Sequence, residues 1–212
     1  MSLPHLLREI RACRVCEANL PRAPRPILRV SRGARLLIIS QAPGIKVHQT
    51  GIPWNDASGD HLRDWMNLDR STFYDKTKIA IVPIGFCYPG AGENGGDKPP
   101  RPECAPLWHQ RVFEQLPNLQ LTLLVGQYSQ MRYLGSNRKR SMTETVEAFT
   151  EYGPKFFPLP HPSWRSRIWM RRQPWFEQTV VPQLRRAVQR VLADEGTRSR
   201  PQLSSGGANG SA

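Results

Sequence analysis

Four cysteines form the pattern in this sequence that points most directly to chemistry. Cys13 and Cys16 make a C-x2-C pair, and Cys87 and Cys104 make a C-x16-C pair around a loop rich in Gly and Pro. Four thiolates are the ligand set of a 4Fe-4S cluster or of a structural zinc ion, and a cytosolic protein seldom keeps them as disulfides. The loop has almost no apolar residue, so it cannot form a core of its own, and a metal bound by the cysteines would order it. Residue types alone leave iron-sulfur, zinc and four separately buried thiols open.

Two further segments have residue types suited to a ligand site. Residues 40–60 read SQAPGIKVHQTGIPWNDASGD, so an Ala-Pro-Gly turn, whose backbone N–H groups can face a ligand, precedes a large aromatic residue, Trp54. His161 starts an HPS triplet, and four arginines and three tryptophans follow within a few residues. Each segment by itself is also typical of an ordinary surface loop.

The charge of the chain favours a polyanionic partner. Thirty Lys and Arg against seventeen Asp and Glu give a net charge of +13, which suits nucleic acid or an acidic membrane surface. After His161, basic residues interleaved with aromatic ones suit phosphate contact plus base stacking or wedge insertion; an amphipathic membrane-surface segment is the competing interpretation. No run approaches the roughly 18 apolar residues of a membrane span, and the N-terminus lacks a signal-peptide core. We therefore expect a cytoplasmic protein, acting as a monomer.

Short, continuously apolar runs predict strands covered on both faces, as in a parallel sheet. The runs are residues 35–40, 79–86, 121–126 and 156–161. Amphipathic patterns predict helices over residues 3–12, 58–68, 102–116 and 175–193. This alternation predicts a three-layer α/β/α sandwich with a central four-stranded parallel sheet. We expect one domain over residues 1–195 and a disordered tail over residues 196–212, which lack apolar periodicity.

The predicted elements would bring the unusual segments together. In open α/β sheets ligands bind beyond the carboxyl ends of the strands. The Ala-Pro-Gly turn follows the first predicted strand, the third cysteine follows the second, and His161 ends the fourth. We therefore expect one site at this end of the sheet.

In combination and order, these motifs resemble those of uracil-DNA glycosylases of the iron-sulfur branch, the family 4 type, from Cys13 to about residue 192. The resemblance implies that Cys13, Cys16, Cys87 and Cys104 ligate a 4Fe-4S cluster. It also implies that residues 41–44 with 50–54 form the first catalytic motif and that His161-Pro162-Ser163 form the last. The implied activity is excision of uracil, or of another deaminated or damaged base, from DNA.

Several positions depart from that family pattern and bear on the substrate. Gln41 stands where the family has Glu, and Val47-His48 replace a downstream Glu-Asp pair, so the usual water-activating carboxylate is absent. The stretch with Asp56 and Asp60 is similar to that of family 5 enzymes. Pro83 aligns with the family's uracil-reading Asn and has neither a side-chain amide nor a backbone donor. Hypoxanthine, xanthine and a mismatched pyrimidine are therefore open as substrates beside uracil.

The expected chemistry assigns a role to each of these residues. His161 would donate to the leaving-group oxygen, assisted by backbone N–H groups around Gln41 and Ala42. Trp54 would stack on the flipped base, and His48 or Asp56 would position or activate water. The DNA contacts are assigned to Ser163, Arg165, Arg167, Arg171 and Arg172, with Trp164, Ile168 or Trp169 filling the space that the base vacates.

Two other functional classes stay open at this stage. A non-catalytic iron-sulfur protein that recognises damaged or single-stranded DNA would keep the basic segment and lack a water activator. A relative that traps DNA covalently through a histidine would need a basic insertion after the second motif, and the sequence shows none.

Overall fold

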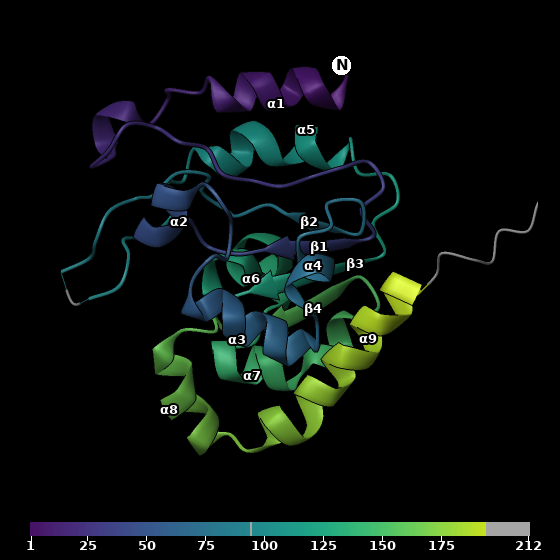
Figure 1. Ribbon diagram of the computed structural model, residues 1–212. Coiled ribbons are helices and arrows are strands. Elements are labelled where there is room, and N and C mark those ends of the chain that lie inside the picture. Colours follow the sequence, from purple (N-terminus) through teal and green to yellow (C-terminus); the bar gives the residue numbers. More distant parts are fainter. Residues whose placement is uncertain (94, 194–212) are drawn as a thin grey trace, which may run out of the picture.

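The computed structural model describes residues 1–93 and 95–193, which fold around a sheet of four parallel strands (Figure 1). The strands are β1 (Leu36–Ile39), β2 (Ile79–Ile81), β3 (Leu121–Val125) and β4 (Phe156–Leu159). They lie in the order β2-β1-β3-β4, with Leu36 of β1 between Ile79 and Leu121. The predicted three-layer fold with a four-stranded parallel sheet is confirmed.

Helices connect the strands and follow the last one. The α-helices are α1 (Leu3–Arg11), α2 (Ile45–Thr50), α3 (Ala57–Met66), α4 (Arg70–Phe73), α5 (Gln110–Phe113), α6 (Gln127–Leu134), α7 (Met142–Glu147), α8 (Trp164–Arg172) and α9 (Val181–Ala193). Shorter helical turns are η1 (Glu17–Asn19), η2 (Ala105–His109), η3 (Gly135–Asn137), η4 (Phe149–Tyr152) and η5 (Phe176–Val180). Within residues 1–93 and 95–193, every helix is too short or too polar to span a lipid bilayer.

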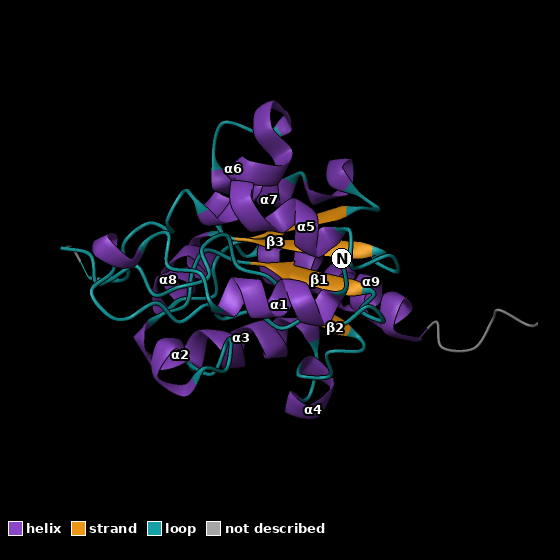
Figure 2. Ribbon diagram, turned by 90° about the horizontal axis from the view of Figure 1, so that it is seen from above, coloured by secondary structure: helices purple, strands orange, loops and turns teal. Residues whose placement is uncertain are grey.

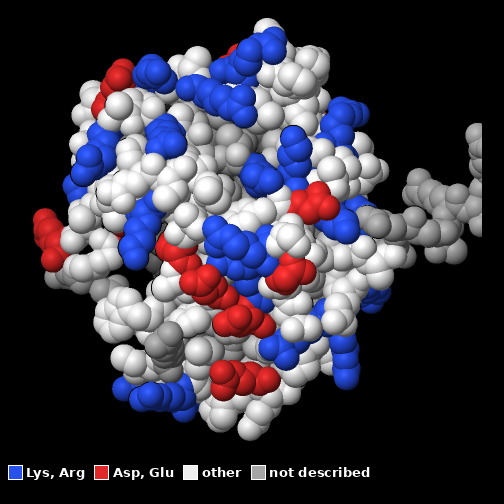
Figure 3. Space-filling view, viewed as in Figure 1, with Lys and Arg blue, Asp and Glu red and all other residues white. Residues whose placement is uncertain are grey.

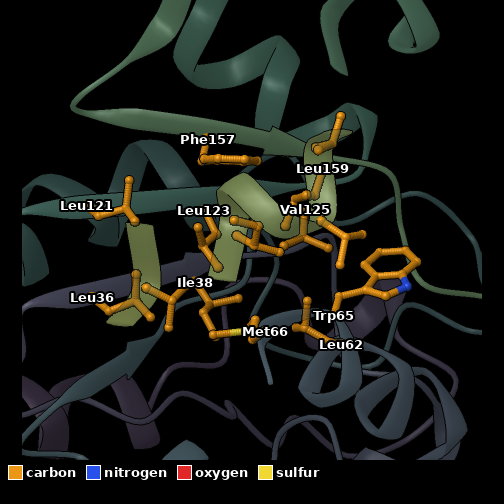
Figure 4. Close-up of a cluster of buried hydrophobic side chains, with 14 of the residues drawn as sticks. Leu36, Ile38, Leu62, Trp65, Met66, Leu121, Leu123, Val125, Phe157 and Leu159 are labelled. Atoms are coloured by element: carbon orange, nitrogen blue, oxygen red, sulfur yellow. The ribbon is translucent and has the colours of Figure 1, made fainter. Parts of the chain in front are cut away.

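The side chains of each strand alternate between two hydrophobic cores, as strand geometry requires. Leu36 and Ile38 of β1 point into a core with α3, α7 and α9 (Figure 4), whereas Leu37 and Ile39 point into a core with α1, α5 and α6. Figure 2 shows the strands running between these helical layers. Because both faces are covered, the functional groups can gather only at the ends or edges of the sheet.

The structure also departs from several sequence predictions. The second strand ends at Ile81 rather than at residue 86, because Pro83 has no N–H for the ladder; the chain beyond it still pairs through Ile84 N with Ser40 O at 2.8 Å. The helix predicted over residues 102–116 is the π-helical turn η2 followed by the short α5.

Five helices were not predicted: α2, α4, α6, α7 and α8. All are short, and four of the nine residues of α8 are arginines. None of them therefore has the long apolar stripe from which a helix is predicted. The tail predicted over residues 196–212 lies outside the described residues.

Candidate active site

A pocket opens at the carboxyl end of the sheet, with a volume of about 550 Å³ that includes space open to solvent. The turn after β1 forms one side of it, and residues following β2 and β4 form its floor and back. Its lining includes six residues expected at the site: Gln41, Ala42, Trp54, Asp56, Pro83 and His161. The strand order therefore joins segments more than 100 residues apart in one concave site.

Trp54 and His161 stack on each other at the back of this pocket. Their ring centroids are 5.6 Å apart and their planes differ by 26°. Trp54 is buried, and His161 is half-buried. The indole therefore presents an aromatic wall to a ligand while the imidazole presents ring nitrogens beside it.

His161 is a neutral imidazole at neutral pH. Burial lowers its pKa from the ordinary 6.5 to about 4, and the negative charge of Asp56 opposes this shift only in part. The backbone carbonyl of His161 accepts a hydrogen bond from Ser163 N at 2.8 Å and another from the Ser166 hydroxyl. A neutral, fixed imidazole can act as a hydrogen-bond donor without carrying a charge.

The backbone at Trp54 is held in a conformation that non-glycine residues rarely adopt, with φ at 59°. Its carbonyl oxygen accepts a hydrogen bond from the buried Arg63 at 3.3 Å, and the Tyr74 hydroxyl donates to the preceding carbonyl of Pro53 at 2.9 Å. Gly59 passes so close that a Cβ there would lie 1.8 Å from the Trp54 carbonyl oxygen. Together these contacts fix the backbone at Trp54 and therefore the position of its indole.

Pro83 on the pocket floor is supported from behind by a buried histidine. His109 Nε2 lies 3.0 Å from the Pro83 carbonyl oxygen, and its Nδ1 contacts the Tyr133 hydroxyl. Burial lowers the pKa of His109 to about 4, so the ring is neutral. We assign Nε2 as the donor to Pro83 because a carbonyl can only accept, which leaves Nδ1 to accept from Tyr133.

The two candidates for water activation lie in different places. Asp56 lines the pocket and begins α3, where its Oδ1 accepts a hydrogen bond from Gly59 N at 2.9 Å. His48 is not among the lining residues. It sits on α2 and faces Tyr88, with ring centroids 6.0 Å apart. Helix α2 turns Val47 toward the pocket, and the next residue is rotated about 100° away from it.

The pocket also contains a carboxylate that the sequence did not single out. Asp97, in the loop between Cys87 and Cys104, lines the pocket opposite the Ala-Pro-Gly turn. A Cβ at Gly44 would lie 3.1 Å from Asp97 Oδ2. Asp97 is exposed at the pocket rim, and desolvation by its neighbours, together with the negative charge of Asp56, raises the pKa of its carboxyl. No local motif marks this residue, because its position depends on how the loop folds back.

The four cysteines line one cavity of about 270 Å³, next to Phe86 and Trp108. They form no disulfide, and burial raises the pKa of the Cys87 thiol to about 11 and that of Cys104 to about 12. In the part of the chain that the structure describes, no three or more Cys, His or acidic side chains are arranged around a single metal ion. The four thiols therefore gather around one cavity, although they come from three separate segments of the chain.

The residues predicted to contact DNA lie on α8 and at its start. Ser163 precedes the helix, Arg171 and Arg172 are exposed, and Trp164 has 66% of its surface exposed. Trp169, by contrast, packs against the core, and its Nε1 donates to Thr143 at 2.9 Å. The side chains of Arg165 and Arg167 lie outside the described residues.

Charge is distributed unevenly on the face drawn in Figure 3. Basic side chains cover much of it, while acidic ones form a band over the position of α3, which carries exposed Asp60 and Asp64. A polyanion would be attracted to the basic regions on either side and repelled by this band.

Comparison with known families agrees with the geometry of the site. The sequence profile of the Uracil DNA glycosylase superfamily matches residues 29–185, which run from just before β1 into α9. The match includes the turn after β1, the loop between Cys87 and Cys104, and His161. The chain belongs to the uracil DNA glycosylase superfamily.

Proposed function

We propose that this protein is a DNA glycosylase that excises uracil or another deaminated or damaged base by hydrolysing its N-glycosidic bond. Members of the superfamily are typically hydrolytic N-glycosylases. The observation that carries the proposal is the stacked pair of Trp54 and neutral His161 in a pocket at the carboxyl end of the sheet. An extruded base needs an aromatic wall to stack on and hydrogen-bond donors at its edge.

Cleavage of the glycosidic bond leaves negative charge on the departing base and positive charge on the sugar. His161 is assigned as the donor to a base oxygen, and the backbone N–H groups around Gln41 and Ala42 assist it. Trp54 supplies stacking worth on the order of 1 to 3 kcal/mol. Because His161 is already neutral and fixed, it stabilises the anion without reorganising.

Cys13, Cys16, Cys87 and Cys104 are assigned as the ligands of a 4Fe-4S cluster. Support comes from the four thiols, which line one cavity and form no disulfide. The cluster would supply positive charge that keeps four buried thiolates ionised and would pin the loop between the second pair.

DNA is the proposed partner, bound along α8 and the adjoining basic surface. Arg171 and Arg172 are assigned to phosphate contacts because both are exposed on α8, and the exposed Trp164 and Ile168 are assigned to fill the space that the flipped base leaves. Arg165 and Arg167 belong to the same helix. Ser163 is proposed to contact the backbone where α8 begins.

The pocket lining also bears on which base is excised. Pro83 cannot form the side-chain amide contacts that would select uracil, and Ser40 and Ser58 are the neutral hydroxyls in the pocket lining. A serine hydroxyl both donates and accepts, so it can read several exocyclic oxygens. We therefore propose a pocket that accepts deaminated bases beyond uracil.

The test is a panel of oligonucleotides, each with one lesion: uracil, hypoxanthine, xanthine, or thymine opposite guanine. Single-turnover incubation followed by alkali should cleave the strand at one or more lesions. Undamaged duplex is the control substrate. Tight binding to lesion DNA with no alkali-labile site on any substrate would instead identify a damage-recognition protein without catalysis.

A further inference from the structure

The pocket lacks the carboxylate that its relatives would carry after β1, because Gln41 stands there. A glycosylase still needs an anionic group near the sugar, to accept a proton from water or to balance the developing positive charge. Two carboxylates line the pocket, Asp56 and Asp97. They come from different walls, and their surroundings differ.

Asp56 is already engaged in the fold. Its Oδ1 caps α3 through the hydrogen bond from Gly59 N, and a cap of this kind stabilises a helix by about 1 kcal/mol. Asp97 has no such tie: within the described residues, no hydrogen bond to its carboxylate is found. The side chain is exposed at the pocket rim, where desolvation by its neighbours and the charge of Asp56 raise its pKa and make it a stronger base than an ordinary aspartate.

Asp97 is carried by a hairpin that extends outward beyond α2 in Figure 1. Ala91 pairs with Asp97 in an antiparallel bridge, and Lys98 N donates to the Gly90 carbonyl at 2.8 Å. Asp97 Oδ2 is so close to Gly44 that a Cβ there would lie 3.1 Å away. The hairpin therefore directs this carboxylate against the Ala-Pro-Gly turn.

The returning arm of the hairpin is fixed to the cysteine cavity. Pro100 packs on Gly85, where a Cβ would lie 3.0 Å from the proline ring. Arg101 forms an ion pair with Glu103 at 2.5 Å, and Cys16 Sγ lies 3.6 Å from the same carboxylate. Contacts thus run along the arm from Cys16 to Asp97.

We propose that Asp97 is the catalytic carboxylate of this enzyme, delivered to the pocket by the cysteine-anchored hairpin in place of the missing carboxylate after β1. This inference rests on the proposed glycosylase function. In the reaction, the oxygen of water bonds to C1′ while the bond from C1′ to the base nitrogen breaks. The bonding pair leaves with the base, Asp97 accepts the proton of the attacking water, and the base anion takes up a proton from solvent.

The test compares Asp97→Asn with Glu93→Gln, an exposed carboxylate on the same hairpin that does not line the pocket. Both are assayed in single turnover on the lesion that the wild-type protein cleaves fastest, and binding to the same DNA is measured separately. Asp97→Asn should lower the rate by about 100-fold or more, the usual contribution of a general base, while DNA affinity stays within about three-fold. Glu93→Gln should match the wild-type protein in both.

A rate for Asp97→Asn within three-fold of wild type would overturn the assignment. So would an equal loss of rate and affinity, since this would indicate a structural role for the hairpin. Asp97→Glu provides a further readout, because it keeps a carboxylate and should recover part of the rate that Asn loses. A wild-type protein that cleaves none of the lesions would refute the glycosylase function itself, which separates the two failures.

Discussion

The pocket has two walls that are built in different ways. The wall at the end of the sheet contains Trp54 and His161 and is held by the hydrophobic core, by Arg63 and by the close approach of Gly59. The wall opposite is the hairpin that carries Asp97, whose arms begin and end at Cys87 and Cys104. The first wall is held by core packing, which persists as long as the chain is folded. The second wall depends on the four cysteines at the base of the hairpin and on the group that they bind.

Because of this difference, base binding and hydrolysis depend on different walls of the pocket. The sheet wall offers stacking and a neutral donor, which recognise and stabilise the base. The hairpin wall offers the carboxylate that acts on water or the sugar. Loss of the cluster should therefore disable catalysis while leaving much of the base-binding surface intact.

His161→Ala, on the sheet wall, should reduce activity more than any other substitution. Removing one preorganised donor to a developing anion should lower the single-turnover rate by about 1000-fold. DNA affinity should change by only a few-fold, since other residues make the phosphate contacts. The measurement is abasic-site formation beside a binding titration, with His5→Ala on α1 as a remote control. An unchanged rate would remove His161 from the mechanism.

The second prediction tests the hairpin wall with the substitution Cys13→Ser. Cys13 is chosen because it is half-buried and contributes least to the core. The wild-type protein should be brown, with absorbance near roughly 400 nm, and the variant should lose that absorbance. Its excision rate should fall by about 100-fold, as for loss of Asp97, because the hairpin would no longer be anchored.

Circular dichroism should show that the sheet and helices of this variant remain. A colourless wild-type protein containing zinc would contradict the cluster assignment. A bleached Cys13→Ser that excises at the wild-type rate would contradict the link between the cysteines and the hairpin wall.

Acid should weaken the support beneath the pocket floor. His109 has a folded-state pKa of about 4 against an ordinary 6.5, so the unfolded chain binds an extra proton between these values. Stability therefore falls as the pH drops from 6.5 toward 4, by about 3 kcal/mol for this residue. His109→Gln should make the dependence of the unfolding free energy on pH less steep in that window without abolishing it, because His161 also has a pKa of about 4 and titrates there. An unchanged slope would show that His109 is not the titrating group.

A smaller effect is expected from Gly59→Ala, which places a methyl group against the Trp54 carbonyl. Overpacking of this kind costs about 1 to 3 kcal/mol, and here it should also displace the indole. The matched control is Gly92→Ala on the hairpin, where the nearest atom to a new Cβ is 3.7 Å away. Urea denaturation and excision assays should show a loss for Gly59→Ala alone. If both substitutions left stability and excision rate unchanged, the contact between Gly59 and the Trp54 carbonyl would not hold the sheet wall.

The sequence predicts the architecture well because four short, continuously apolar runs alternate with amphipathic segments, which favours buried parallel strands joined by helices. Gln41 and His161 could be placed because each follows the end of a strand, whereas Trp54, between α2 and α3, was assigned through the family motif. His48 could not, since its direction depends on the short helix α2, which has no apolar stripe. Asp97 was missed for a different reason: it reaches the pocket only through pairing with Ala91 across a loop of Gly and Pro.

Release of a free base from the pocket is tested most directly by detecting that base. Duplex DNA carrying a single lesion is incubated with the wild-type protein and with His161→Ala, and the low-molecular-mass fraction is analysed by mass spectrometry. We predict free deaminated base from the wild-type reaction, in equal amount to the abasic sites formed, and almost none from His161→Ala. Lesion DNA that is bound tightly by the wild-type protein but releases no base from any lesion would contradict this claim.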